Sequence, residues 1–400
     1  MDINNAKQQV ITAGKRLVEN GLIARTWGNV SCRVDEENFV ITPSGKAYDS
    51  LVPDDIVQVR TADLSYEGET KPSSEKGVHA EVYKARPEVN FVIHTHQNKA
   101  SVISALDRGI RDLIGDAAVY IGGDIPLAEY GLPGTGKLKK GVAVALTQTK
   151  GNAILMAHHG ALCYAVDSEA AFQVASLLEI VCGDTIYSQF RKVFGENPKN
   201  ENNYVEFVLK KLTKCESTID FSTKSCYNSK RSGENSFLLW ETDGREQQYP
   251  LQGETARESD GSEPPEATLH RRIYQAREDI SVILQNKTAA VAGLSCLAQP
   301  LLPQLDDFAQ LIGISVRTAA PDDASACVQA LKGRHAVFLE GQGALCCGKN
   351  ESDARAVELV LEKGCITKLG SMLFGCDRVI SSLESRLMRY IYLKKYSKKE

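Results

Sequence analysis

Two apolar runs in the first half of the chain each end on histidine. Residues 91–96 read FVIHTH, and residues 154–160 read ILMAHHG. Side chains alternate between the two faces of a strand, so His94 and His96 should project from the same face. Gly160 lets the chain turn after the second run. The pattern therefore predicts two strands that deliver His94, His96 and His159 at their ends.

Segments with helical periodicity alternate with these strands. Helices are predicted for residues 1–21, 73–86, 168–181 and 202–214. In the second of them, Ser73 and Ser74 offer capping oxygens and Glu75 falls in the first turn. His79 follows one turn later on the same face, and we interpret it as a core or supporting histidine rather than a metal ligand. Alternating strands and helices indicate an α/β layered fold.

The second half of the chain repeats the first, because three blocks recur in the same order at nearly the same spacing. The matched positions are Glu75, His79, Tyr83, Ala85 and Arg86 with Glu266, His270, Tyr274, Ala276 and Arg277; Gly160, Ala161, Leu162 and Cys163 with Gly343, Ala344, Leu345 and Cys346; and Ala171, Val174, Leu178, Glu179 and Cys182 with Ala354, Val357, Leu361, Glu362 and Cys365. We interpret this pattern as a tandem duplication.

The second copy has lost the imidazoles. In the frame of the repeat, His94, His96 and His159 correspond to Gln285, Lys287 and Gln342, and a lysine cation cannot share a site with a divalent metal. No counterpart of residues 26–34 (TWGNVSCRV) or 41–45 (ITPSG) is evident. The sequence thus predicts a catalytic domain at 1–215 and a degenerate, non-catalytic domain at 216–400, with the linker-like stretch 253–266 as a loop inside the second.

Composition limits the remaining classes of function. A chain of 400 residues exceeds the usual size of one core, which agrees with two domains. A net charge of −4 without a basic block argues against binding to nucleic acid or to a membrane surface. Eleven scattered cysteines indicate reduced thiols. No opening segment resembles a signal peptide and none approaches the length of a membrane span, so we expect a cytoplasmic protein.

Three imidazoles and a carboxylate are the ligands of a zinc site that can open one position. His94, His96, His159 and Glu75 would form it. Two glycine-containing segments suit an anion, since glycine allows close backbone approach and small side chains donate. They contribute Gly28 and Asn29, and Ser44 and Gly45; Ser73 and Ser74 at a helix N-terminus would complete the cradle.

These motifs together resemble the class II aldolase/adducin family: GNVSCRV, ITPSGK, KPSSE, HTH, IPLAEYG and HHG occur in order across the first half. The resemblance implies a three-layer α/β/α domain, here present twice. It implies Zn²⁺ or another divalent metal on His94, His96 and His159, with Glu75 as the metal-side carboxylate and base. It implies phosphate binding by Gly28, Asn29, Ser44, Gly45, Ser73 and Ser74. Tyr130 would be the tyrosine that family members lend across a subunit interface as proton donor.

The activity implied by the resemblance is zinc-dependent cleavage of a sugar 1-phosphate, similar to L-fuculose 1-phosphate, to dihydroxyacetone phosphate and an aldehyde. Ribulose-phosphate 4-epimerases of this fold carry aspartate at the position of Glu75, which favours the aldolase. Dehydratases of the methylthioribulose 1-phosphate type keep the glutamate and stay open, as does a non-catalytic adducin-like interaction protein. The expected partners are a small sugar phosphate and further copies of the chain, as a dimer of two-domain chains or a larger homo-oligomer.

Overall fold

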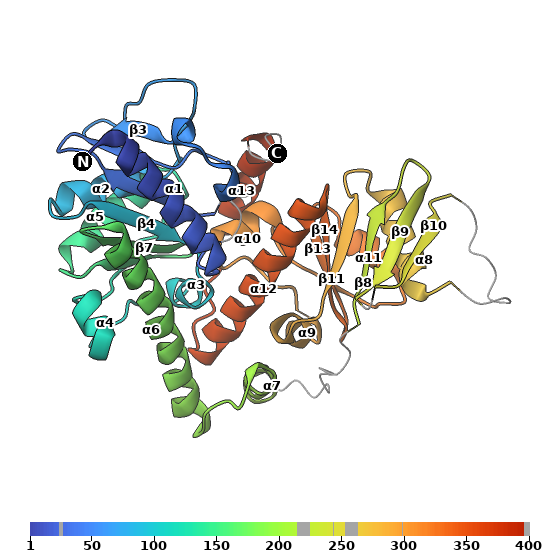
Figure 1. Ribbon diagram of the computed structural model, residues 1–400. Coiled ribbons are helices and arrows are strands. Elements are labelled where there is room, and N and C mark those ends of the chain that lie inside the picture. The colour runs from blue at the N-terminus through green and yellow to red at the C-terminus, as the bar shows by residue number, and fades with distance from the viewer. Residues whose placement is uncertain (24–26, 214–224, 243, 253–262, 298, 396–400) are drawn as a thin grey trace. The chain divides into compact units, whose positions relative to one another are not determined.

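The computed structural model describes residues 1–23, 27–213, 225–242, 244–252, 263–297 and 299–395 (Figure 1). It divides into two compact units, formed mainly by Met1–Asn197 and by Pro198–Leu373 with Val379–Leu393. The boundary predicted at residue 215 lies outside the described residues. Helix α7 (Glu201–Leu212), assigned by the sequence to the first domain, packs on α9 (Ala289–Ser295) and α12 (Glu351–Leu373), so the compact units divide before it.

The first unit is built on one seven-stranded sheet in the order β3-β2-β1-β4-β7-β6-β5. Its strands are β1 (Asn29–Arg33), β2 (Asn38–Ile41), β3 (Val57–Arg60), β4 (Phe91–Thr95), β5 (Leu127–Ala128), β6 (Ala153–Met156) and β7 (Gly160–Ala165). The β5–β6 pair is parallel and the other neighbours are antiparallel. The central strands β4 and β7 are buried along their whole length, which explains why their sequences are continuous apolar runs.

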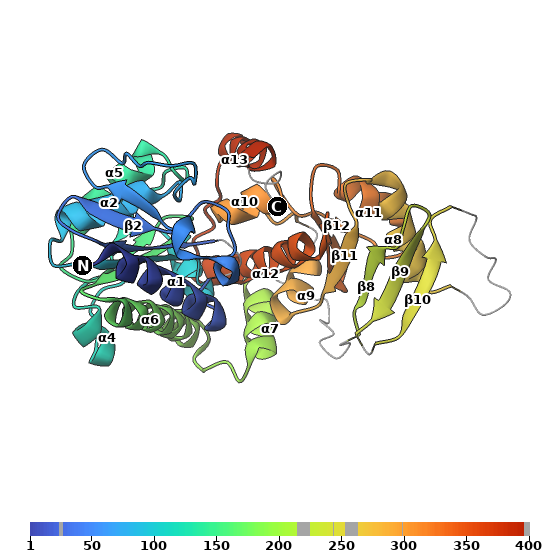
Figure 2. The same cartoon turned by 45° about the horizontal axis from the view of Figure 1, so that its top comes forward.

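Helices cover both faces of this sheet, as the three-layer prediction requires. One face carries α2 (Lys76–Ala85) and α5 (Gly136–Thr147), whose apolar side chains share a core with Val92, Ile154 and Leu162. The other carries α1 (Ile3–Glu19), α3 (Asn98–Ser104) and α6 (Ser168–Phe194) (Figure 2). Short helices α4 (Gly115–Tyr120), η1 (Tyr48–Ser50) and η2 (Pro53–Asp55) lie in the connections.

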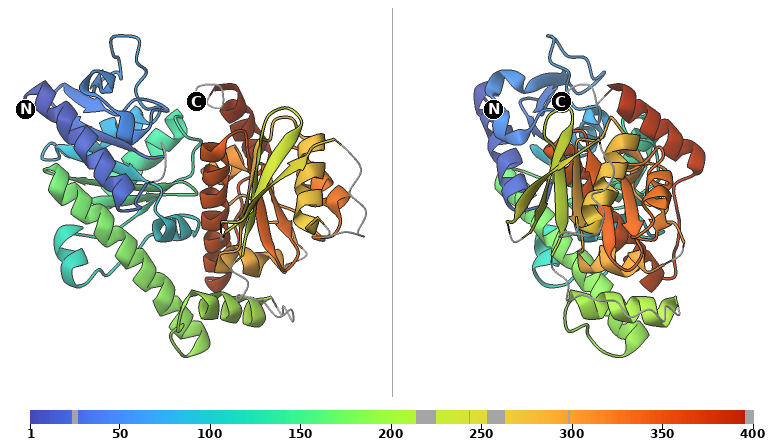
Figure 3. Two further views of the ribbon diagram at one scale, coloured as in Figure 1. Left: turned by 45° about the vertical axis from the view of Figure 1, so that its right-hand side comes forward. Right: turned by 90° about the vertical axis from the view of Figure 1, so that its right-hand side faces the viewer.

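The second unit has a seven-stranded sheet of the same order, β10-β9-β8-β11-β14-β13-β12. Its strands are β8 (Tyr227–Arg231), β9 (Ser236–Glu241), β10 (Glu246–Pro250), β11 (Val282–Asn286), β12 (Thr318–Ala319), β13 (Ala336–Leu339) and β14 (Gly343–Gly348). Helices α8 (Pro265–Ala276) and α11 (Ala324–Ala330) pack on one face, and α9 and α12 on the other (Figure 3). Helices α10 (Asp306–Leu311) and α13 (Ser382–Lys395) complete the unit.

Strand registers confirm the repeat residue by residue. His94 is paired with Leu162, and Gln285 with Leu345, as the sequence alignment predicts. Both turn glycines meet the same obstacle, since a Cβ on Gly160 or on Gly343 would lie 2.2 Å from a carbonyl oxygen of β4 or β11. These positions require glycine in both copies.

The expectation that the second copy lacks a counterpart of residues 26–34 is wrong for the strand in that segment, residues 29–33. Strand β8 occupies the place of β1, and its register on β11 aligns Ser229 and Arg231 with Ser31 and Arg33. The two arginines make the same contacts, each bonding three backbone carbonyls around the end of the following helix. The segment after β2 does differ: residues 42–56 separate β2 from β3, whereas a tight hairpin joins Glu241 to Glu246.

Helix α6 is long and apolar enough to cross a membrane by length and composition alone, contrary to the sequence expectation. One such helix is weak evidence, because the core helix of a globular protein passes the same test. Its packing is that of a core helix: it buries Phe172, Val174 and Leu178 and contacts β4 and β7. Its Glu179 carboxylate accepts hydrogen bonds from the backbone amides of Lys99 and Ala100.

Candidate active site

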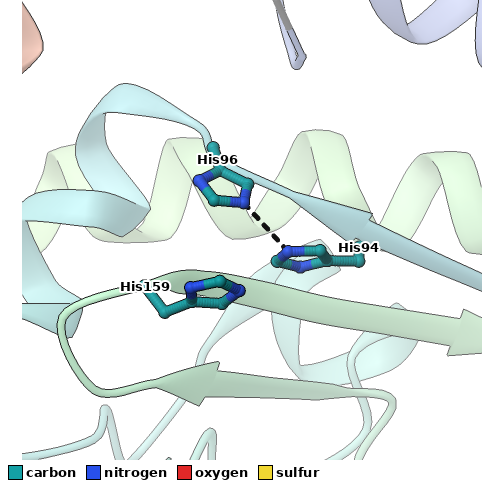
Figure 4. A group of neighbouring side chains, drawn as sticks. All are labelled: His94, His96 and His159. Carbon is teal, nitrogen blue, oxygen red and sulfur yellow. Dashed lines mark hydrogen bonds between the residues drawn. The ribbon is translucent and has the colours of Figure 1, made fainter. Parts of the chain in front are cut away.

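Three histidines from two neighbouring strands converge in the first unit (Figure 4). His94 lies on β4, His96 just beyond its end, and His159 in the β6–β7 turn. Their ligand nitrogens all lie within 4.8 Å of one another, and His94 and His159 stack with ring centroids 4.9 Å apart. His94 and His159 are buried. The period-two argument therefore predicted the right face for both histidines of FVIHTH.

The backbone of the β6–β7 turn sets the direction of His159. Its amide donates to the Met156 carbonyl, and the preceding His158 has φ of 59°, a left-handed conformation that costs a non-glycine residue about 1 kcal/mol or more. In the second unit the matching residue is Gly341, with φ of 68°. The turn is thus common to both units, but only the first places an imidazole at its inner position.

A backbone carbonyl fixes the tautomer of His94. Its Nδ1 lies 2.8 Å from the Ala161 oxygen, which can only accept, so Nδ1 carries the proton. Burial lowers the pKa of His94 well below its ordinary value, which leaves the ring neutral with a lone pair on Nε2. A second hydrogen bond of this kind is how proteins orient metal-binding imidazoles.

Glu75 closes the cluster from the N-terminus of α2. Its Oε1 lies 2.7 Å from His159 Nε2 and its Oε2 lies 3.3 Å from His94 Nε2. Burial alone would raise the pKa of this carboxyl, but His159, His94 and His96 outweigh that effect and hold the pKa well below its usual range. Glu75 is the N-cap residue rather than a residue of the first turn, and its side chain makes no capping hydrogen bond.

This donor set fits a divalent metal. The lone pair on His94 Nε2 faces His96 Nε2 at 3.0 Å and a carboxylate oxygen at 3.3 Å, and such electron-rich atoms repel unless a proton or a cation lies between them. Bonds of about 2.0–2.1 Å from imidazole nitrogens to one ion need separations close to these. The cluster of His94, His96 and His159 could therefore hold a metal ion, with Glu75 beside it.

Asn29 has a role that sequence reasoning did not find. Its amide Nδ2 donates to Glu75 Oε2 at 2.8 Å, and its Oδ1 contacts Nε2 of the buried His79. The resemblance assigned Asn29 to phosphate binding, and its side chain bonds Glu75 and His79. The signal in the sequence was His79 itself, one helical turn after Glu75, yet its partner lies 50 residues away along the chain.

The other predicted phosphate-binding residues lie on adjoining segments. The Ser73 amide donates to the Thr42 carbonyl, and the Ser44 amide to the Lys71 carbonyl, which brings Ser44–Gly45 beside Ser73–Ser74. Ser73 is buried, whereas Gly45 and Ser74 are exposed. Because the amides of Ser44 and Ser73 are engaged, their hydroxyls and the amides of Gly45 and Ser74 are the groups we expect an anion to meet.

Two further residues of the prediction take defined places. Gly28 has φ of 98°, and a Cβ there would lie 2.5 Å from the His94 carbonyl oxygen, so it lets β1 approach the backbone of His94. Thr26, from the same motif, lies outside the described residues. Tyr130 packs edge-on against His158, with ring centroids 5.4 Å apart, one residue from the His159 ligand position.

The corresponding place in the second unit is occupied by its own side chains. Gln285 accepts a hydrogen bond from the Tyr227 amide and Lys287 donates to the Ser225 carbonyl. Gln342, in the place of buried His159, is exposed. The residues at the three ligand positions therefore hold strand β8 or face solvent.

Comparison with known proteins identifies the family. The model of the class II aldolase and adducin N-terminal domain matches residues 8–185 and 233–369. The chain belongs to this family. The two matched segments correspond to the two units, so both copies carry the family fold, and class II aldolases typically depend on a divalent metal.

Individual relatives match about half of the chain. L-fuculose phosphate aldolase of Escherichia coli (strain K12) is 34% identical over 181 residues, which are 45% of this chain and 82% of that protein. The protein of the same name from Shigella flexneri gives the same values. A solved structure of L-fuculose 1-phosphate aldolase is 32% identical, covering 48% of this chain and 89% of its own, with a TM-score of 0.43.

Proposed function

We propose that the first unit is a divalent-metal-dependent aldolase. It cleaves a sugar 1-phosphate of the L-fuculose 1-phosphate kind to dihydroxyacetone phosphate and an aldehyde, and zinc is the proposed ion. The observation that carries the proposal is the convergence of His94, His96 and His159 on the ionised Glu75 carboxylate. The relatives named for this activity support the choice of substrate class.

The bound ion would supply Lewis-acid polarisation of the substrate oxygens beside the bond that breaks. In the direction of carbon–carbon bond formation, the ionised Glu75 carboxylate would remove a proton from the carbon of dihydroxyacetone phosphate that becomes the nucleophile, and that carbon would attack the aldehyde carbonyl. The Tyr130 hydroxyl is proposed to donate its proton to the aldehyde oxygen as the bond forms. Cleavage is the reverse of these steps, starting from protonated Glu75 and deprotonated Tyr130.

The phosphate of the substrate would be held away from the reacting bond by Ser44, Gly45, Ser73 and Ser74. Binding energy from such a remote group orients the substrate and is used in the transition state. The second unit has the hairpin between Glu241 and Glu246 in place of residues 42–56. We therefore propose that it binds no substrate phosphate and is not catalytic.

The test is a panel of ketose 1-phosphates and 5-phosphates supplied to zinc-reconstituted protein. A coupled assay measures dihydroxyacetone phosphate, and mass spectrometry measures all products. Metal-dependent release of dihydroxyacetone phosphate supports the aldolase. Turnover that yields a dehydrated or epimerised sugar phosphate instead identifies the related lyase or epimerase activities and removes the aldolase assignment.

A non-catalytic, adducin-like role is separated by metal content. The second unit shows that this fold persists with its ligand positions filled by glutamine and lysine. If the first unit had followed it, purified protein would carry well under one equivalent of zinc, manganese or cobalt by elemental analysis, even after reconstitution. About one equivalent per chain is the result we expect.

A further inference from the structure

Two buried clusters of serine, histidine and tyrosine hold corresponding positions in the two units. Ser31 Oγ lies 2.6 Å from His79 Nδ1 and 2.7 Å from Tyr83 OH. Ser229 Oγ likewise lies 2.7 Å from His270 Nδ1 and from the Tyr274 hydroxyl. The second unit keeps this cluster although its ligand positions carry no histidine. The shared part therefore serves the fold, by joining the helix to the first strand of the sheet core.

Among the described residues, only the first unit connects this cluster to a carboxylate. His79 Nε2 bonds Asn29 Oδ1, and Asn29 Nδ2 donates to Glu75 Oε2 at 2.8 Å. The strand register puts Tyr227 in the place of Asn29, so the second unit has no side-chain amide at this position. The link from histidine to carboxylate is thus a feature of the unit that carries the histidine cluster.

In the hydrogen-bonded series from Ser31 through His79 and Asn29 to Glu75, the donor and the acceptor of each bond can be assigned. An amide oxygen only accepts, so His79 Nε2 carries the proton. Burial lowers the pKa of His79 to about 3, so the ring is neutral and its Nδ1 accepts from the Ser31 hydroxyl. Rotating the Asn29 amide by 180° would turn its oxygen toward the Glu75 carboxylate, and the two acceptors would repel. With its Nε2–H on Asn29 Oδ1, His79 supports the orientation of the amide that presents the NH₂ group to Glu75.

We propose that His79 is a positioning residue for Glu75. Through Asn29 it fixes the orientation in which one carboxylate oxygen faces His159 and the other faces His94. His79, Asn29 and Glu75 are all buried. When one of their side chains is removed, water therefore does not readily replace the lost hydrogen bond. The expected effect on kcat rests on the proposed function, whereas the expected orientation of Glu75 does not.

The first experiment compares three variants of the full chain. His79→Leu removes both ring nitrogens, and His79→Gln restores one donor and one acceptor. His270→Leu makes the same change in the cluster that has no carboxylate, and is the matched control for the fold. We expect His79→Leu and His270→Leu to lower the thermal midpoint similarly.

The readouts are the visible spectrum of Co²⁺-reconstituted protein and the kinetic constants. We expect His79→Leu to change the Co²⁺ bands and to lower kcat by about tenfold to a hundredfold, with KM within about threefold of wild type. His79→Gln should recover most of both, and His270→Leu should leave both unchanged. If His79→Leu matches His270→Leu in spectrum and kcat, His79 serves only the fold and the proposal fails.

A second measurement needs neither metal nor substrate, and uses the wild-type chain. Nitrogen-15 spectra of histidine-labelled protein report which ring nitrogen carries the proton, and we expect the Nε2–H tautomer for His79 at pH 7. An Nδ1–H tautomer would overturn the proposal. If no sugar phosphate is cleaved while the tautomer and Co²⁺ results hold, only the proposed function fails.

Discussion

At the scale of single residues, the histidines and Glu75 have separable roles. We predict that His96→Ala abolishes tight metal binding, because removal of one of three protein ligands leaves an incomplete site.

Glu75→Gln should keep the metal and lose turnover by about 10²–10⁴-fold, the usual contribution of a positioned acid–base group. Elemental analysis and the product assay measure the two effects. A Gln variant with more than about a tenth of wild-type rate would remove Glu75 from the role of base.

Because His270 is buried in the second unit, we predict that it lowers the stability of the folded protein at acid pH. Burial lowers the pKa of His270 from 6.5 to about 3, so between these pH values the unfolded chain binds one more proton than the folded one. Its contribution to stability is complete above about pH 6.5 and falls with decreasing pH by about 1.4 kcal/mol per unit. We expect wild type to lose about 2 kcal/mol more than His270→Gln between pH 7 and pH 5, in urea titrations at both pH values. Equal losses would show that His270 is protonated in the folded state.

At the scale of elements, sequence periodicity predicted the strands that carry histidine and the helices that flank them. It did so because β4 and β6 are buried along their whole length and read as unbroken apolar runs. It missed β8, because this strand is partly exposed and YNSKR keeps only serine and arginine of NVSCR. Ser229 and Arg231 keep their hydrogen bonds to Tyr274 of α8, which lies about 45 residues later in the sequence. Contacts over such a separation leave no local pattern in the sequence.

The β13–β14 turn offers a prediction about an element alone. Gly341 has φ of 68°, and no atom would lie within 4 Å of an added Cβ, so substitution meets only the cost of the left-handed backbone. Gly341→Ala should destabilise the second unit by about 1–2 kcal/mol. The adjacent exposed Glu340→Ala should change its stability by less than about 0.5 kcal/mol. Denaturant titration of both variants measures the difference, and equal stabilities would contradict the argument.

At the scale of the whole molecule, the second copy has kept the fold of the first but not the residues of its site. The two sheets have identical strand order, while the ligand positions, the loop of residues 42–56 and Tyr130 have no functional counterpart in the second copy. The strand register puts Pro321 in the place of Tyr130. A second unit therefore cannot supply this hydroxyl to a neighbouring site.

If Tyr130 acts across an interface, as the family resemblance implies, it must come from the first unit of another chain. We predict a homo-oligomer of two-domain chains, with a dimer as the simplest closed assembly. Tyr130→Phe and His96→Ala chains should each be inactive alone, since one lacks the hydroxyl and the other the metal. Co-expression with two different tags and purification through both selects the mixed dimer. In it one site combines intact metal ligands with an intact tyrosine, so about half of wild-type activity per dimer should return.

Three outcomes contradict parts of this prediction. Failure to recover any doubly tagged protein would mean that the chains do not associate. A mixed dimer without activity, from two inactive parents, would place Tyr130 in the site of its own chain, where its ring already packs against His158 at 5.4 Å between centroids. If Tyr130→Phe alone retains full turnover, the tyrosine is not the proton donor. The hydroxyl proton of the substrate would then pass to water or to another side chain near His159.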